Sequence, residues 1–361
     1  MAVSSGHEAN PKLDQRRVDA LAETMTDEVG AALGCALVAV GDRLGIYKAL
    51  AANGPSDPET LATKMGLSER MMREWLLNQA AGKYICYDPA TKRYFMTPEQ
   101  AAVLADETSP SFLGGAFQFA TALIKAEERI SQVFRTGRGM RWGEHHEDLF
   151  GGLSRFSRPI YQHKLCDVFI PAVEGLAERL EAGALVADIG CGHGFSTMLM
   201  AERFTASRFI GFDNHPRSVA EATRVAAERG LQERVRFELA DATSFPARGY
   251  DVIAFFNCMH DVGHASECAA HCLKALKPDG RVFMVEPNSG DQVEDNFNAA
   301  GRLFTGSSVL CCTPHGMVDG GAALGTVVTD ARFEAIFRAA GFKHFHRVMS
   351  TRFNRVLEAR P

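Results

Sequence analysis

The second half of the chain alternates short apolar runs with segments of helical periodicity, and this alternation constrains the fold more than any other feature. After Gly183 come the apolar runs ALVADIG, SRFIGFD, RVRFELAD, YDVIAFFN and GRVFMVEP. Helical patterns separate them around residues 195–203, 218–229 and 265–276. Strands that are apolar nearly throughout and are joined by helices form a parallel sheet covered on both faces. We therefore predict a Rossmann-like α/β domain with a doubly wound, mainly parallel sheet, whose ligands bind at the carboxyl ends of the strands.

The first third of the chain predicts a second, mainly α-helical domain. Apolar residues recur at three- and four-residue steps from about Val18 to Ala52, as on the buried face of a helix. The residues that follow predict a helix, a tight turn at Gly66, a second helix with Ser68 as its N-cap, and a short hairpin up to Met96. Elements in this order form a winged helix-turn-helix arrangement.

A winged helix raises the question of DNA binding, and the second predicted helix argues against it. Arg70 and Arg73 alternate with Glu69 and Glu74, whereas a DNA-binding surface carries clustered positive charge. The rest of this helix is apolar, which is typical of a helix that packs in a core or against a second subunit. We therefore expect this domain to serve dimerisation and do not expect nucleic acid as a partner.

A helical region separates the two predicted domains and contains one loop of unusual composition, GRGMRWGEHHEDLF. Trp142 and His145 in this loop are candidates for a lid that contacts a substrate; a solvated turn anchored by Trp142 explains the loop equally well. The four expected parts of the chain are a disordered tail, a winged-helix dimerisation domain, a helical linker with a substrate lid, and a Rossmann-like catalytic domain, at residues 1–17, 18–108, 109–182 and 183–361.

Charge and composition argue against several classes of protein. The formal net charge of −5 provides no general attraction for nucleic acids or anionic membranes. The first 17 residues are polar and lack the apolar segment of a secretory signal or a membrane span, so we expect a cytoplasmic protein with no membrane partner. The nine cysteines, several of them within apolar runs, indicate reduced, buried thiols rather than disulfides. The adjacent Cys311 and Cys312 lack a CxxC spacing and are interpreted in the same way.

The most specific local pattern is the segment Asp188-Ile-Gly190-Cys-Gly192-His-Gly194, at the end of the first predicted strand. Glycines at this point permit a tight turn and let a ligand approach the backbone. Their alternation after an acid differs from the GxGxxG spacing of dinucleotide enzymes, which deliver a pyrophosphate to a helix N-terminus, so a nicotinamide-dependent oxidoreductase is disfavoured. Asp188 would repel a pyrophosphate, but it would orient the turn and attract the cationic amino-acid end of S-adenosylmethionine.

Acids also end the next two predicted strands. The second strand ends at Asp213, at the spacing of a carboxylate that accepts hydrogen bonds from ribose hydroxyls. The third strand ends at Asp241 and Ala242, where an acid can meet the amino group of adenine. Acids at three successive strand ends indicate a ligand rather than packing, because buried carboxylates need partners.

The fourth predicted strand runs into Asn257-Cys-Met-His260-Asp261. His260 is the candidate general base or substrate-orienting group, because an imidazole titrates near neutral pH, and Asp261 is its candidate catalytic neighbour. Further along the chain, Arg302 is a candidate clamp for a substrate carboxylate. His315 is a candidate partner of His260 at the pocket.

The segments VADIGCGHG, FIGFD, LADA, FFNCMHDV and LKPDGRVFMVEP follow the order of motifs in class I S-adenosylmethionine-dependent methyltransferases. Nearly the whole chain resembles the bacterial winged-helix methyltransferases related to plant-type O-methyltransferases. The resemblance implies S-adenosylmethionine as cofactor, S-adenosylhomocysteine as product, a small-molecule acceptor and a homodimer formed through the N-terminal helices. The residues expected to line the cofactor are Asp188, Gly190, Gly192, Gly194, Asp213, Asn214, Asp241, Ala242 and Asn257.

The acceptor and two alternative functions stay open at this point. Gly263 follows HDV where the plant-type pattern has an aromatic residue after the acid, and this departure leaves the acceptor atom and the need for a base open. A hydroxy, keto or thioether acid, methylated on oxygen, sulfur or carbon, is one candidate for the small-molecule acceptor. One alternative is a winged-helix transcription regulator with a ligand-sensing methyltransferase-like domain. The other is a metal-assisted keto-acid C-methyltransferase, since two histidines and Asp261 suit iron or zinc. No fixed metal-ligand spacing accompanies them, so the sequence itself predicts no metal site.

Overall fold

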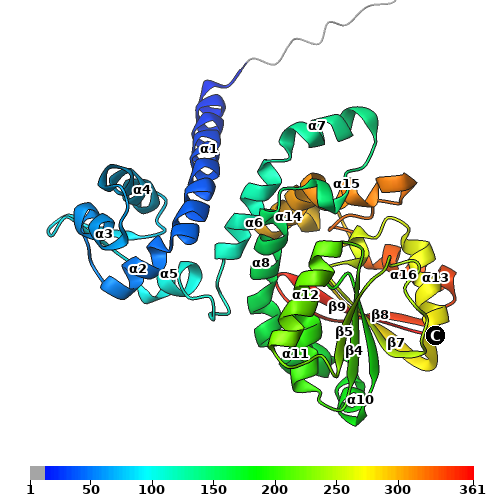
Figure 1. The fold of residues 1–361 in the computed structure, drawn as a ribbon. Coiled ribbons are helices and arrows are strands. Elements are labelled where there is room, and N and C mark those ends of the chain that lie inside the picture. Colours follow the sequence, from blue (N-terminus) through cyan, green and yellow to red (C-terminus); the bar gives the residue numbers. More distant parts are fainter. Residues whose placement is uncertain (1–12) are drawn as a thin grey trace, which may run out of the picture. The chain divides into compact units, whose positions relative to one another are not determined.

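The computed structural model describes residues 13–361, and the chain divides into two compact units with a boundary between Ala101 and Ala102 (Figure 1). Most of the expected disordered tail, residues 1–12, lies outside the described residues. The first helix, α1 (Gln15–Leu44), begins three residues before the expected start of the winged-helix domain. The unit boundary lies within α5 (Pro98–Leu104), earlier than the expected boundary after residue 108.

The first unit contains the winged helix-turn-helix arrangement that the sequence predicts. After α1 come α2 (Ile46–Asn53), α3 (Pro58–Met65), α4 (Glu69–Ala81) and an antiparallel hairpin of β1 (Cys86–Asp88) and β2 (Arg93–Phe95). Ser68 is the N-cap of α4, as predicted, and its hydroxyl accepts a hydrogen bond from the backbone N–H of Met71. Trp75 of α4 packs against α1, where a Cβ at Gly41 would overlap its ring. Only glycine permits this approach of the two helices.

The second unit begins with a series of helices, of which those from α8 onward pack against the sheet that follows. These are α6 (Gly114–Ile124), α7 (Glu127–Thr136), α8 (Asp148–Lys164), a π-helical turn (Leu165–Phe169), α9 (Ile170–Ala172) and α10 (Leu176–Ala182). A Cβ at Gly115 or Gly152 would collide with the backbone of the facing helix, so these two glycines allow α6 and α8 to lie in close contact. The expected linker is therefore an integral part of the second unit. Residues before it join this unit too, since Thr108 O is 2.9 Å from His163 Nε2.

A seven-stranded sheet forms the centre of the second unit, in the order β5-β4-β3-β6-β7-β9-β8. The strands are β3 (Leu185–Ile189), β4 (Arg208–Asp213), β5 (Val235–Leu239), β6 (Tyr250–Phe256), β7 (Leu276–Pro287), β8 (His344–Ser350) and β9 (Asn354–Arg360). Strands β3 to β7 are parallel, and β9 runs antiparallel to both of its neighbours. This confirms the predicted Rossmann-like, mainly parallel sheet.

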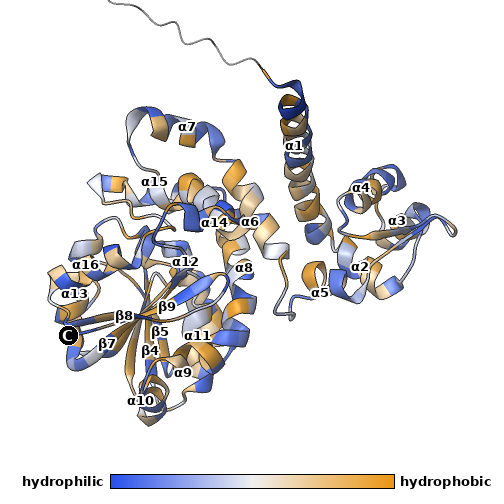
Figure 2. Ribbon diagram, turned by 180° about the vertical axis from the view of Figure 1, so that it is seen from behind, coloured by the Kyte–Doolittle hydropathy of each residue, from blue (hydrophilic) through white to orange (hydrophobic). Residues whose placement is uncertain are grey.

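Helices cover both faces of the sheet, and the central strand β6 shows why. All seven of its residues are buried. Ile253 and Phe255 pack on the side of α13 (Ala265–Ala275) and α16 (Asp330–Ala340), whereas Val252 and Ala254 pack on the side of α10 and α11 (Phe195–Arg203). Side chains alternate between the two faces of a strand, so a strand apolar throughout requires a cover on both. The hydropathy colouring of Figure 2 shows this as hydrophobic strands between helices with hydrophilic outer faces.

The strand order places a ligand site at one edge of the sheet. Chain connections leave β3 in opposite directions, first to β4 and β5 and later to β6 and β7. In doubly wound sheets the crevice at such a switch point, outside the carboxyl ends of the strands, is where ligands bind. The loops after β3, β4, β5 and β6 therefore have to supply the site.

Candidate functional site

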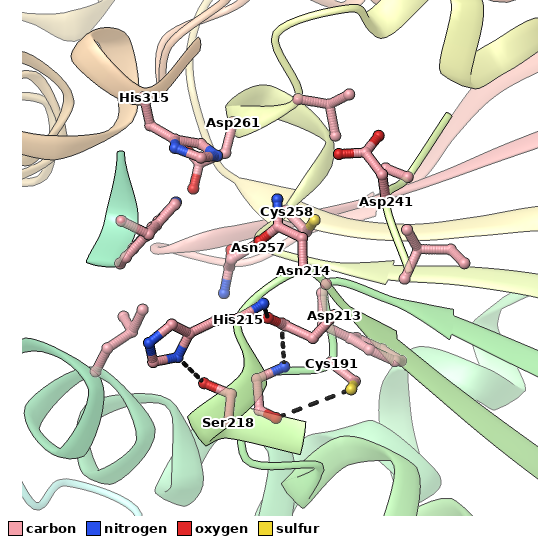
Figure 3. A pocket seen from close by; sticks show the side chains of 18 of the residues that line it. Cys191, Asp213, Asn214, His215, Ser218, Asp241, Asn257, Cys258, Asp261 and His315 are labelled. Atoms are coloured by element: carbon pink, nitrogen blue, oxygen red, sulfur yellow. Dashed lines mark hydrogen bonds between the residues drawn. The ribbon is translucent and has the colours of Figure 1, made fainter. Parts of the chain in front are cut away.

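A cavity of about 290 Å³ opens at the carboxyl ends of β3, β4, β5 and β6 (Figure 3). Ten of the predicted site residues line it: Trp142, Gly190, Gly192, Asp213, Asn214, Asp241, Ala242, Asn257, Asp261 and His315. Five others, Asp188, Gly194, His260, His145 and Arg302, are not among its lining residues. The structure thus brings together residues from the lid loop, from four strand ends and from the segment before α16.

The glycine turn after β3 forms one wall of the cavity. Gly190, Gly192 and Gly194 have φ angles of 69°, 54° and 72°, in the left-handed region that disfavours side chains. A Cβ at Gly192 would meet no atom within 4 Å, whereas one at Gly194 would overlap the ring of Phe237. Gly192 therefore offers bare backbone to a ligand. Gly194 instead serves the packing of the turn, which corrects its prediction as a cofactor contact.

Asp188 is buried beneath the turn and does not reach the cavity, contrary to the expectation that it lines the cofactor. Its Oδ2 accepts hydrogen bonds from Ser196 Oγ at 2.8 Å and Thr197 Oγ1 at 2.6 Å, at the start of α11. Burial raises the pKa of Asp188 to about 7, although these two hydroxyls act to lower it. The predicted role in orienting the turn fits this position. Direct contact with the cofactor does not, because the side chain points into the protein.

The raised pKa of Asp188 predicts a pH-dependent stability. Between the usual value of 3.8 and about 7 the folded protein keeps this proton and the unfolded chain does not. The free energy of unfolding is therefore expected to fall by about 1.4 kcal/mol per pH unit across this window. Thermal unfolding measured from pH 4 to pH 7.5 should show this loss in the wild type relative to Asp188→Asn. Asp167→Asn, at an exposed position, should follow the wild type; equal pH dependence in all three proteins would contradict the prediction.

Asp213 stands at the end of β4, where both carboxylate oxygens face backbone N–H groups. Oδ2 accepts from Gly192 N at 2.9 Å and Oδ1 accepts from His215 N at 2.9 Å. Each oxygen retains a lone pair, and the side chain lines the cavity beside Asn214. The carboxylate thereby links the glycine turn to the β4 loop and keeps acceptor capacity for a ligand.

Asp241 and Asn257 complete the row of polar groups at the strand ends. Asp241 Oδ1 accepts from Thr243 N at 2.9 Å and Thr243 Oγ1 at 2.8 Å. Burial acts to raise the pKa of Asp241, but these hydrogen bonds outweigh it and the pKa lies below its usual value. Asn257 has a φ of 51°, an uncommon conformation that concentrates at functional sites. Its Nδ2 donates to Tyr161 Oη at 2.7 Å.

His260 is buried behind the cavity wall, whereas Asp261 reaches the cavity. His260 Nδ1 lies 2.5 Å from Glu286 Oε2, and Nε2 lies 3.2 Å from Asp261 Oδ1. Burial acts to lower the pKa of His260, but the carboxylates of Asp261 and Glu286 outweigh it and raise the pKa well above 6.5. An imidazolium held between two carboxylates neither touches a ligand nor accepts a proton at neutral pH. The prediction that His260 acts as the base is therefore corrected to a positioning role for Asp261.

His315 is the histidine of the predicted set that faces the cavity. It belongs to α15 (Thr313–Gly316), and Figure 3 shows it beside Asp261. Burial lowers its pKa below 6.5, although Asp261 acts in the opposite direction. Its Nδ1 is buried and has no hydrogen-bond partner among the described residues. A neutral imidazole in this position can accept a proton from a bound molecule.

The predicted lid loop lies against α15. Met140 N donates to Pro314 O at 2.9 Å, and the Trp142 ring lies 5.9 Å from the His315 ring, centre to centre. Trp142 lines the cavity, as expected of a substrate contact, while His145 is buried and lies outside the lining. His145 is therefore not placed to contact a substrate directly.

Arg302 is exposed on α14 (Ala299–Ser307) and does not line the cavity, so the structure does not place it as a carboxylate clamp. Arg141 of the lid loop is the arginine among the residues that line the cavity. Its Nη2 lies 2.9 Å from Asp319 Oδ2. The sequence offered a signal for Arg141, because it directly precedes the candidate Trp142.

Sequence reasoning missed further residues of the site. Glu286, which binds His260, lies near the end of the apolar run GRVFMVEP, and an acid within an apolar strand is the signal that could have identified it. Phe150 and Tyr161 reach the cavity from α8, and the Phe150 ring stacks on His215 with the ring centres 4.4 Å apart. No local pattern marks these two residues, because helix packing alone brings them to the sheet edge.

Family models match both parts of the chain. Residues 180–341 match the methyltransferase domain family, and residues 31–106 match the family described as Rv2258c-like winged HTH domain. The chain thus combines a methyltransferase domain with a winged helix-turn-helix domain. Together with the fold, these matches confirm the resemblance to class I methyltransferases of the winged-helix and Rossmann type.

Curated relatives and solved structures agree with these domains. The chain is 36% identical over 110 residues to trans-aconitate 2-methyltransferase of Streptomyces avermitilis and 31% identical over 139 residues to that of Escherichia coli. These matches cover 30% and 38% of this chain but only 40% and 53% of the relatives. The structure resembles mitomycin 7-O-methyltransferase (TM-score 0.72, 20% identity, 96% and 100% of the two chains). It also resembles human N-acetylserotonin methyltransferase in complex with S-adenosylmethionine (0.67, 17%, 98% and 99%). At these identities the two structures establish the fold.

Proposed function

We propose that the chain is an S-adenosylmethionine-dependent methyltransferase that acts on a small-molecule acceptor. The proposal depends above all on the cavity in which the glycine turn, Asp213 and Asp241 meet at the carboxyl ends of three adjacent strands. A cavity of about 290 Å³ suits a small molecule. Isothermal titration calorimetry with S-adenosylhomocysteine tests the proposal. Heat of binding at a one-to-one ratio is expected, and its absence would overturn the assignment.

The residues of the cavity fit this cofactor. Gly192 leaves space beside its backbone, Asp213 has free lone pairs for ribose hydroxyls, and Asp241 holds a carboxylate that can accept from the adenine amino group. Bound there, the cofactor supplies an electrophilic methyl group on a positively charged sulfur. The chain's own contribution is to hold acceptor and methyl group in line at close range, which accounts for a large part of such a rate enhancement.

We place the acceptor at the end of the cavity lined by Trp142, Asp261 and His315. Neutral His315 is the proposed proton acceptor for a hydroxyl substrate. Asp261 beside it stays ionised: burial acts to raise its pKa, but the effects of His260, His315 and Cys312 together outweigh burial and lower it. A thioether acceptor needs no base, because no proton leaves when its sulfur is methylated.

A carboxylic acid is the proposed acceptor class. Support comes from Arg141 in the cavity lining and from the curated relatives, whose named substrate, trans-aconitate, is a carboxylic acid. Arg141→Gln is expected to lower kcat/KM for such an acid roughly tenfold, since a hydrogen bond to a charged group contributes about 1.5–3 kcal/mol. A screen that compares hydroxy, keto and thioether acids with phenols, with S-adenosylhomocysteine formation as the readout, tests the acceptor class and gives the kcat/KM of the wild type and the variant. Arg138→Gln on the same loop is the control, and turnover of phenols without turnover of acids would contradict the proposal.

A homodimer through the N-terminal helices is part of the same proposal. Exposed apolar residues follow one side of α1, namely Leu21, Met25, Val29, Leu33, Val40 and Leu44. By length and composition alone α1 also qualifies as a membrane span, but a stripe on one side suits a protein partner better than lipid on all sides. The double variant Val29→Glu, Leu33→Glu is expected to elute as a monomer in size exclusion with light scattering. Glu23→Gln should leave the wild-type mass unchanged; a monomeric wild type would contradict the proposal.

We also propose the cytoplasmic location that the sequence predicts. All nine cysteines are free thiols, which fits a reducing compartment.

A transcription regulator is the second candidate function, favoured by the winged helix-turn-helix match. The structure gives it little support, because Arg70 and Arg73 of α4 form ion pairs with Glu74 and Glu69 on the same helix. Gel-shift assays with genomic fragments separate the two functions, since a regulator must retard specific DNA.

A further inference from the structure

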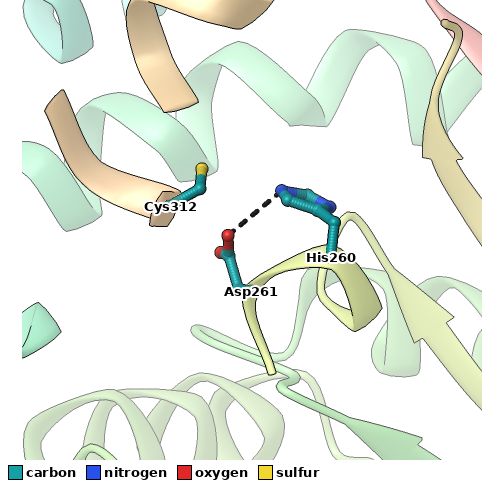
Figure 4. A group of neighbouring side chains, drawn as sticks. All are labelled: His260, Asp261 and Cys312. Carbon is teal, nitrogen blue, oxygen red and sulfur yellow. Dashed lines mark ion pairs between the residues drawn. The ribbon is translucent and has the colours of Figure 1, made fainter. Parts of the chain in front are cut away.

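Three side chains behind the cavity bring a nitrogen, an oxygen and a sulfur ligand to one point (Figure 4). One ring nitrogen of His260, one carboxylate oxygen of Asp261 and Sγ of Cys312 all lie within 4.8 Å of one another, and all three residues are buried. His260 and Asp261 belong to the turn after β6 (Met259–Asp261), and Cys312 ends the π-helical turn Ser308–Cys312. Ligand atoms that each bind one ion at about 2.0–2.3 Å lie at most about twice that distance from one another, and these three atoms lie near or within that limit.

Glu286 orients the imidazole of His260 for this role. Glu286 is fully buried and accepts hydrogen bonds from Cys258 N at 3.2 Å and Met259 N at 2.9 Å, in addition to its contact with His260 Nδ1. Once Nε2 gives up its proton to bind a metal ion, the hydrogen on Nδ1 stays with Glu286 and the lone pair of Nε2 points toward Asp261. A carboxylate on the far nitrogen of a histidine is the usual second contact of metal-bound histidines.

Asp261 supplies an independent sign of a ligand. Its Oδ1 is buried and forms an ion pair with His260, whose Nε2 lies 3.2 Å away, but no described residue meets this oxygen in the geometry of a hydrogen bond. An ion bound by both atoms would give the oxygen the direct partner that it lacks.

We propose that His260, Asp261 and Cys312 bind one divalent transition-metal ion of the zinc or ferrous type. A thiolate ligand disfavours magnesium and calcium, which prefer oxygen. Three protein ligands leave a coordination position open, as in catalytic rather than structural zinc sites. Asp261 also lines the cavity, so the proposed ion would lie at the cavity wall.

A function for the ion follows if the proposed methyltransferase activity is correct. An ion at this point would polarise an oxygen atom of the acceptor. This role rests on the proposed function, whereas the metal site itself does not.

The experiment uses the full chain, purified without added metal and without a histidine tag. We expect about one zinc or iron per chain by mass spectrometry of the elements. After chelation, titration with Co²⁺ should give a thiolate-to-cobalt charge-transfer band that saturates at one equivalent. Cys312→Ser should lose this band and Cys311→Ser, at the adjacent buried cysteine, should keep it. Glu286→Gln should weaken Co²⁺ binding by about 10- to 100-fold, the usual effect of removing such a second contact.

Thermal unfolding of each variant and calorimetry with S-adenosylhomocysteine separate the possible failures. Wild-type protein that is folded but gives neither bound metal nor a charge-transfer band would overturn the proposal, as would a band that survives Cys312→Ser. If Cys312→Ser does not fold, the wild-type band and the affinity of Glu286→Gln decide. Loss of nucleoside binding with an intact cobalt band would refute the proposed function and leave the metal site standing.

Discussion

Replacing Asp213 by alanine is expected to lower the affinity for S-adenosylhomocysteine by at least roughly 100-fold. Two hydrogen bonds to a charged acceptor contribute about 1.5–3 kcal/mol each, and each 1.4 kcal/mol corresponds to a tenfold change in affinity. The substitution also removes the acceptor of Gly192 N and His215 N, so the glycine turn loses its link to the β4 loop. Isothermal titration calorimetry measures the effect.

Two further variants separate ligand binding from damage to the fold. Asp213→Asn keeps one acceptor oxygen and is expected to lose less affinity than the alanine variant. Asp167→Ala removes an exposed acid far along the chain from the turn and should bind like the wild type. An Asp213→Ala protein that is folded and binds with wild-type affinity would show that the nucleoside lies elsewhere.

Replacing His315 by asparagine is expected to reduce kcat by about 10²- to 10⁴-fold for a hydroxyl acceptor, the usual contribution of a general base. The base must be neutral to act, and burial lowers the pKa of His315. Activity of the wild type is therefore expected to stay constant as the pH falls to 6.5 and to decline only below it. This acidic decline in kcat/KM should disappear in His315→Asn, because the residue that titrates is gone.

His344→Asn, at an exposed position of β8, is the matched control and should retain wild-type kcat and the wild-type pH profile. If His315→Asn keeps wild-type kcat with a hydroxyl acceptor, the proton goes to another group. With a thioether acceptor, by contrast, His315→Asn is expected to keep the wild-type kcat, because the sulfur has no proton to lose.

The cofactor side of the site was largely predictable from the sequence. In parallel strands the carboxyl ends share one edge of the sheet, so residues that directly follow predicted strands have to meet. Gly190, Gly192 and Asp241 follow strands in this way, Asp213 is the last residue of one, and all four line the cavity. Asp188 was predicted wrongly for a physical reason. Side chains near the end of a strand alternate between the two faces of the sheet, and the side chain of Asp188 lies beneath the turn rather than in the cavity.

The acceptor side was predicted less well. Arg302, His315 and Cys312 lie in a segment without strand periodicity, where the sequence indicates no direction for a side chain. His315 reaches the cavity and Arg302 does not, because α14 and α15 pack differently against the rest of the unit. Glu286 and Cys312 acquire their significance only because both meet His260.

The sequence alone determines the sheet, its glycine turn and the acids at its edge. Apolar strands that alternate with helices can be covered on both faces in few ways, and the turn and the acids come directly at the ends of these strands. Packing decides the protonation of the histidines and the contacts of Cys312 and Arg141. Burial and neighbouring charge set whether His260 or His315 can accept a proton, and both depend on residues distant in the chain that only the folded molecule brings together.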